Sequence, residues 1–228
     1  MKYTTLAMYA LAAALMAPQV AHAQGGATTL TYVGTIDNAR MGSQTYTITL
    51  GSKPNSYVMQ GKVDLNFDIT AALFVKVHVI NQSNFTETWE NGKLVALKGQ
   101  TRDRDDNYIY ELTRASAPTV TVTKNRDKPE AKQVPDDVAP ASFWLEGYFM
   151  KAPHSQYIST NSGSVKPAKP PKLESQQTVN FRNQQVKVNY YTMEYGGDKY
   201  EYWYLVDGGL LYKRANVEQG YKVVFTLQ

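Results

Sequence analysis

Beyond its first 27 residues, the chain alternates between apolar and polar side chains with a period of two. The clearest stretch is Tyr57–Ile69, where Val63, Leu65 and Phe67 share one face and charged or amide side chains share the other. Side chains of a strand point to opposite faces in turn, so this pattern is typical of a strand with one buried and one solvated face. The chain is therefore expected to fold mainly into β-strands.

Turn signals recur about every ten residues, a spacing typical of β-sandwiches and barrels. Asn91-Gly92 is the strongest of these signals, because both residues accept the positive φ of a tight hairpin. Three further glycine-rich turns separate the last predicted strands, which are Gln185–Tyr195, Lys199–Val206, Leu210–Asn216 and Tyr221–Leu227. These strands are expected to form a meander of hairpins.

The predicted fold is all-β: a single antiparallel, strongly curved sheet or flattened barrel of about nine to eleven strands with one short helix. The helix is expected near 142–150, where apolar residues have helical spacing. Ala71–Ile80 and Ser83–Glu90 are expected as separate strands, and two proline-containing loops, 125–140 and 161–171, bracket an insertion. An outer-membrane barrel is the structural alternative, but the charged faces of several strands argue against it.

The first residues have the pattern of a secretory signal peptide. Lys2 precedes an apolar run, Leu6–Val20, which ends in Ala21-His22-Ala23. This run is shorter than the roughly 20 residues that a membrane-spanning helix needs. We expect a signal peptide over residues 1–23, cleavage after Ala23, a single β domain over 24–228, a periplasmic location and no membrane insertion.

Composition excludes several classes of chemistry. The absence of cysteine removes thiolate catalysis, zinc–thiolate sites and iron–sulfur clusters. Beyond the leader, His78 and His154 are the only histidines, so a three-histidine metal site is excluded as well. The net charge of +4 is spread without a basic stripe, and no nucleic-acid partner is expected. We expect no metal and no cofactor.

Acidic residues offer two weak signals of a site. The tip Asp103–Asn107 carries oxygens at alternate positions that could suit Ca²⁺, but Arg104 competes with a cation, so a solvated tip is favoured and cation binding stays open. Glu87 and Glu90 flank Trp89, and a pair of carboxylates beside an aromatic ring is what a glycosidase needs. Their spacing places them on opposite faces of one strand, and no nucleophile elbow occurs, so we expect no enzyme activity.

Aromatic residues are the feature most suggestive of function. Eight tyrosine and tryptophan residues fall within residues 190–212. They can pack a sheet on both faces, or they can form a concave surface for an apolar ligand. For the second interpretation the candidate ligand contacts are Trp89, Trp144, Tyr148, Tyr202, Trp203 and Tyr204.

Three segments carry a resemblance to a known family: Glu87–Leu97 with the tip that follows it, Ser142-Phe143-Trp144, and Trp203–Leu211. In their order and spacing they resemble the bacterial proteins grouped as domain of unknown function 6134, over nearly the whole mature chain. The chain departs from that pattern at Trp144-Leu145. The resemblance implies a periplasmic β protein of unknown activity and supplies no catalytic residues.

These observations lead to a non-catalytic periplasmic binding or carrier module for an apolar ligand or envelope component. A structural or assembly factor of the cell envelope, acting by protein–protein contact through a strand edge, is the alternative. An enzyme that uses carboxylates or tyrosine alone is the third hypothesis. The oligomeric state is left open.

Overall fold

The computed structural model describes residues 27–70, 76–114, 116–152, 154–218 and 220–228. The expected signal peptide and the cleavage after Ala23 lie outside these residues. Among the described residues, no helix is both long and apolar enough to cross a membrane.

The described strands form one large sheet of thirteen strands in the order β12-β13-β14-β15-β16-β1-β2-β3-β4-β5-β6-β7-β8. Each strand pairs antiparallel with its neighbours. Their bounds are β1 (Ala27–Ile36), β2 (Ala39–Leu50), β3 (Tyr57–Thr70), β4 (Lys76–Glu90), β5 (Lys93–Asp103), β6 (Asp106–Arg114), β7 (Pro118–Lys124), β8 (Glu130–Gln133), β12 (Lys172–Phe181), β13 (Gln184–Tyr195), β14 (Asp198–Leu205), β15 (Leu211–Glu218) and β16 (Tyr221–Leu227).

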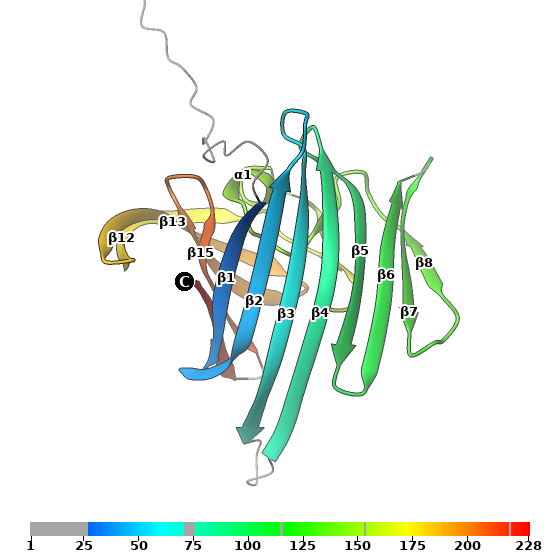
Figure 1. Cartoon of the computed structure of the whole chain (residues 1–228), viewed down its shortest axis with the longest axis horizontal. Coiled ribbons are helices and arrows are strands. Elements are labelled where there is room, and N and C mark those ends of the chain that lie inside the picture. Colours follow the sequence, from blue (N-terminus) through cyan, green and yellow to red (C-terminus); the bar gives the residue numbers. More distant parts are fainter. Residues whose placement is uncertain (1–26, 71–75, 115, 153, 219) are drawn as a thin grey trace, which may run out of the picture.

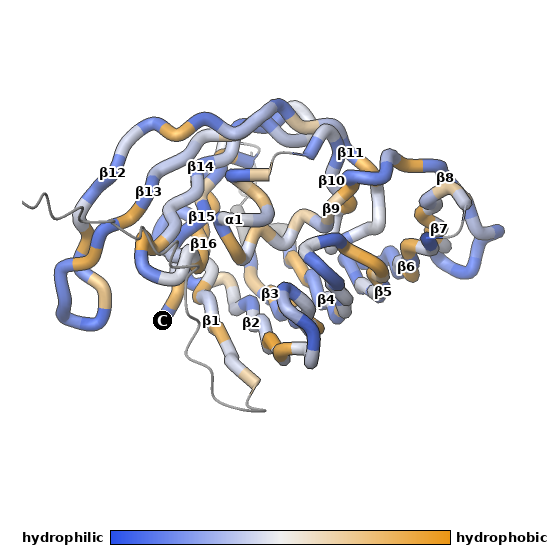
Figure 2. The backbone as a smooth tube through the Cα atoms, turned by 90° about the horizontal axis from the view of Figure 1, so that it is seen from above, coloured by the Kyte–Doolittle hydropathy of each residue, from blue (hydrophilic) through white to orange (hydrophobic). Residues whose placement is uncertain are grey.

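Residues 134–171, which we call the insert, connect β8 to β12. The insert holds β9 (Ala139–Pro140), α1 (Glu146–Phe149), β10 (Gln156–Ile158) and β11 (Val165–Pro167). Its three strands form a small sheet of their own in the order β11-β10-β9. The large sheet curls around the insert, so that α1 and β9–β11 lie between the β12–β16 arm and the β1–β8 arm (Figures 1 and 2).

The predicted fold class is confirmed: the protein is all-β, with a large, curved antiparallel sheet and one very short helix. The predicted strand number was wrong, because the main sheet has thirteen strands, and this sheet is open, with β12 and β8 at its two ends. The count fell short because β8 forms inside the loop 125–140.

Two further boundaries differ from the predictions. The helix is a single turn, because Phe143 takes a φ of 51°, a left-handed conformation that an α-helix cannot include. The strand break expected near residue 81 does not exist, since β4 continues through it, and Asn81 and Ser83 are buried inside the sheet. Part of the expected strand Ala71–Ile80 lies outside the described residues.

Glycine lets large rings lie across the concave face of the sheet. Gly61 pairs with Phe85, and Gly99 pairs with Tyr110. A Cβ atom at Gly61 would lie 2.2 Å from the Phe85 ring, and one at Gly99 would lie 2.2 Å from the Tyr110 ring. Each ring therefore occupies the space of the missing side chain, which is a recurrent way to curve a sheet over a packed interior.

Candidate functional site

Tyrosine hydroxyls of the large sheet hold the irregular backbone of the insert. Tyr46 donates to the Ser142 carbonyl at 2.9 Å, and Tyr204 donates to the Phe143 carbonyl at 2.8 Å. Tyr110 donates in the same way to the carbonyl of Thr160, at 2.6 Å. Buried carbonyls outside regular structure need such partners. The abundance of tyrosine is thus explained, because each ring fills the core and its hydroxyl satisfies the insert.

At the other end of the interior, the insert meets a second aromatic cluster. The Trp144 ring lies edge-on to Tyr57, with centroids 5.0 Å apart, and Tyr148 packs on Trp89 at 5.2 Å. Beneath them, the carboxyl group of Glu87 is fully buried and accepts one hydrogen bond, from Trp89.

The environment of Glu87 favours its protonated form. Its Oε1 atom, the Ser142 hydroxyl and the Trp144 indole N–H have no hydrogen-bond partner among the described residues. Burial raises the pKa of Glu87 to about 7, against the opposing effect of the Ser142, Trp89 and Trp144 dipoles beside it. The charge of this buried carboxyl group depends on pH, and with it the contact between the sheet and the insert.

A second buried carboxylate belongs to the insert and accepts hydrogen bonds from side chains of the sheet. Glu146 of α1 accepts hydrogen bonds from Asn189 at 2.8 Å and from Tyr191 at 2.9 Å, and its other oxygen pairs with Lys151 at 2.8 Å. Its backbone N–H also donates to the carbonyl of Gly209 at 2.8 Å. Because its oxygens are used in these contacts, Glu146 fixes the position of α1.

The six aromatic residues singled out from the sequence do not form one surface. Trp89, Trp144 and Tyr148 belong to the cluster around Glu87, while Tyr202 and Tyr204 are fully buried beside Phe143. Trp203 lies on the outer face of the sheet. Its ring stacks on Tyr190 at 4.8 Å, and Lys213 Nζ lies 4.5 Å from its centroid. Their role as ligand contacts stays a prediction.

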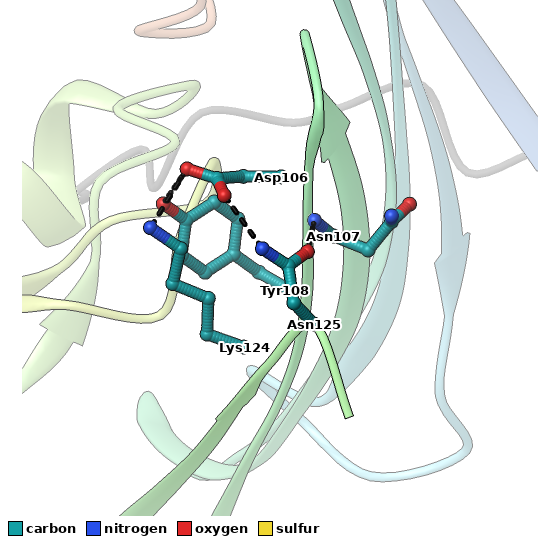
Figure 3. A network of polar contacts seen from close by, with 5 residues as sticks. All are labelled: Asp106, Asn107, Tyr108, Lys124 and Asn125. Carbon is teal, nitrogen blue, oxygen red and sulfur yellow. Dashed lines mark hydrogen bonds and ion pairs between the residues drawn. The ribbon is translucent and has the colours of Figure 1, made fainter. Parts of the chain in front are cut away.

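The acidic tip is bonded to the end of β7 and to the residue that follows it (Figure 3). Asp106 pairs with Lys124 at 2.8 Å and accepts hydrogen bonds from Asn125 at 2.7 Å and from Tyr108 at 3.2 Å. The contacts to Lys124 and Asn125 hold the pKa of Asp106 below its usual value. Among the described residues, no group of three or more histidine or acidic side chains is arranged to hold a metal ion.

A cavity of about 400 Å³ lies at the end of the curled sheet where β1 turns into β2 and β5 turns into β6. We call it the hairpin-end cavity. The insert lines it through Ala141, Phe143, the segment 159–162 and Lys166. Its apolar wall comes from strands of both arms and includes Ile36, Met41, Leu65, Phe67, Val79 and Val223.

Among the described residues, Arg214 is one of three cations that line this cavity, with Arg104 and Lys166. Arg214 of β15 faces Tyr202 on one neighbouring strand and Phe225 on the other. Sequence reasoning missed it because a β-bulge between Trp203 and Tyr204 shifts the pairing with β15, so that Leu211 and Arg214 both face the interior. A glycine-rich turn ahead of a strand signals such a shift only weakly.

The family comparison covers most of the chain. Residues 32–228 match the model of the family described as Domain of unknown function (DUF6134). No curated protein and no solved structure matches the chain.

Proposed function

We propose that this chain, which belongs to the DUF6134 family, is a non-catalytic binding or carrier module that holds an apolar ligand in the hairpin-end cavity. The cavity itself carries the proposal. Its volume of about 400 Å³ falls within the range of roughly 300–1,000 Å³ typical of small-molecule sites. Its lining combines apolar and aromatic side chains with as many polar or charged ones, and an apolar ligand would lie against the apolar wall named above.

The rest of the interior is filled by side chains of the sheet and the insert, which supports this assignment. The aromatic surface that a ligand would otherwise cover is buried beneath the insert, and its rings are nearly or fully inaccessible to solvent. A ligand therefore has space at the hairpin end, on a scaffold that the insert makes rigid. The leader pattern further supports a periplasmic location, where a carrier shields an apolar molecule from water.

The test is titration of the full mature chain with Nile red, an uncharged apolar dye. Val223 lines the cavity, so Val223→Trp should fill it and weaken binding by about tenfold or more. Val217→Trp is the matched control, because Val217 is 61% exposed and lies outside the cavity. Dye binding that is equal in both variants, with both folded, would place the ligand elsewhere.

The edge strand β12 favours the second candidate, a structural or assembly factor of the cell envelope. β12 ends the large sheet, and its first seven residues are all exposed. An exposed edge strand can pair with a strand of another protein. The chain has no cysteine, so Thr178→Cys gives a single thiol at this edge. Specific cross-linking of one envelope protein from there, and none from Lys62→Cys on β3, would support this candidate.

A further inference from the structure

Arg214 lacks a hydrogen-bond partner for its Nε atom and an ion-pair partner for its charge among the described residues. Its guanidinium Cζ lies 4.7 Å from the centroid of the Phe225 ring. The Nε atom is buried and has no hydrogen-bond partner among the described residues. Within the same part of the chain, no carboxylate forms an ion pair with Arg214. A buried donor without a partner is costly, and a cation more so, unless an acceptor arrives with a ligand.

Other unpartnered polar groups lie near it. The hydroxyl groups of Tyr195 and Tyr202 are buried and have no hydrogen-bond partner among the described residues. Tyr202 pairs directly with Arg214 across the strands, and Tyr195 lines the same cavity. Tyr202 is not part of the cavity lining, so Arg214 and Tyr195 are the unpartnered donors among the described residues that line the cavity.

The remaining charged residues of the cavity carry one net negative charge, which the charge of Arg214 offsets. Asp103, Asp198 and Glu218 carry negative charge, and Arg104 and Lys166 carry positive charge. Four of these five residues belong to turns or strand ends beside them, whereas Arg214 is in the middle of β15. Arg214 and Lys166 are therefore the cations of the described lining that lie outside the turns of the large sheet, and Lys166 Nζ lies 5.7 Å from the centroid of the Tyr195 ring.

The apolar wall lies between Arg214 and the turns. Phe225 pairs with Arg214, and Val223 is two residues nearer the β15–β16 turn on the same face. Val223 pairs in turn with Ile36, the last residue of β1. A bound molecule with one charged end would place that end inward and its apolar part along Ile36 and Val223.

We infer that Arg214 binds the anionic head of an amphiphile whose aliphatic chain fills the hairpin-end cavity. This inference rests on the proposed function and adds the chemical class of the ligand. The guanidinium is a planar fork of donors that matches two oxygens of a carboxylate or a phosphate monoester. The hydroxyl of Tyr195 supplies a further donor to the same head.

The test measures binding of three probes with the same chain length: laurate, dodecyl phosphate and dodecanol. Wild-type protein should bind at least one anionic probe roughly 10- to 100-fold more tightly than the alcohol. Arg214→Gln should remove this preference and leave dodecanol binding unchanged. Arg214→Lys, which keeps the charge, should retain part of the preference. Lys213→Gln removes the same charge from the outer face, beside Trp203, and should behave as wild type.

The outcomes test the proposed function and the inference about Arg214 separately. If the three probes bind equally and Arg214→Gln changes nothing, the inference is overturned and the proposed function stands. If none of the probes nor Nile red binds the folded protein, the proposed function fails and the inference with it. A preference for laurate over dodecyl phosphate supports a carboxylate head, and the reverse preference supports a phosphate head.

Discussion

Trp89 donates a hydrogen bond from its indole Nε1 to Oε2 of Glu87, at 3.0 Å, inside the curled sheet. The two residues are one strand period apart on β4, so their side chains share the inner face. Glu90 is exposed on the opposite face, as the sequence predicted. The buried pair lies against the insert, so protonation of Glu87 affects the contact between the sheet and the insert.

Glu87 should make the protein less stable as pH rises. Below about pH 4.5 the carboxyl is protonated in both states. Between about 4.5 and 7 the unfolded chain has released the proton while the folded protein keeps it, so the unfolding free energy falls with pH. The loss is on the order of 3 kcal/mol. Urea unfolding of Glu87→Gln should lack this decrease relative to wild type.

Glu90→Gln is the control for this experiment, because the exposed carboxylate of Glu90 lies on the opposite face of the same strand. Its pH profile should follow that of the wild type. A wild-type profile parallel to that of Glu87→Gln between pH 4.5 and 7 would show that Glu87 titrates in the folded protein as it does in the unfolded chain.

Tyr204→Phe should destabilise the protein by about 1–2 kcal/mol. The change removes the hydroxyl that bonds the Phe143 carbonyl and leaves that buried acceptor without a partner. Thermal or urea unfolding measures the effect. Tyr212→Phe is the matched control: Tyr212 packs on Phe181 at the outer face, and its change should stay within about 0.5 kcal/mol. Equal effects of the two changes would contradict the role given to the inner hydroxyls.

Arg214→Met should raise the stability of the ligand-free protein by about 1 kcal/mol. The variant removes a buried donor that has no partner among the described residues, and methionine keeps the apolar stem. Removing this donor gains more free energy than the lost contact with Phe225 costs. Lys213→Met should stay within about 0.5 kcal/mol of wild type. Because a purely structural arginine would be needed for folding, a loss of stability above about 1 kcal/mol in Arg214→Met would contradict a ligand-binding role.

Gly61→Ala should cost about 1–3 kcal/mol. The added methyl group would lie 2.2 Å from the Phe85 ring, which is buried and packed against the core. Gly147→Ala in α1 meets no atom within 4 Å and should be neutral or slightly stabilising, because alanine favours the helix. Calorimetric melting of the two variants checks the difference, and a neutral Gly61→Ala would show that the ring is not seated over this glycine.

Local chemistry made much of the fold predictable. Asn91-Gly92 forms the expected turn with φ values of 50° and 75°, and β16 occupies the predicted range Tyr221–Leu227. The alternation of side chains also placed Tyr202 and Trp203 on opposite faces of one strand, as the structure has them. In these cases the alternation within a strand and the conformation of its turns were enough to predict the structure.

Long-range packing set the rest of the structure. Nothing local indicates that the insert folds back over the tyrosine face, because this depends on hydroxyls from distant strands meeting carbonyls such as that of Phe143. Arg214 was missed for a related reason: the bulge ahead of it reverses which side chains of β15 face inward. The cavity exists only once the insert has filled the remainder of the interior.

Methionine methyl groups allow the location of the ligand to be observed directly. Met41 lines the hairpin-end cavity, while Met59 is fully buried on β3, where it pairs with Glu87. The decisive measurement is an NMR titration of ¹³C-methyl-methionine protein with laurate and Nile red. The account predicts a shift of the Met41 signal with Met59 unchanged. A shift of Met59 with Met41 unmoved would place the ligand among the aromatic rings beneath the insert and contradict the account.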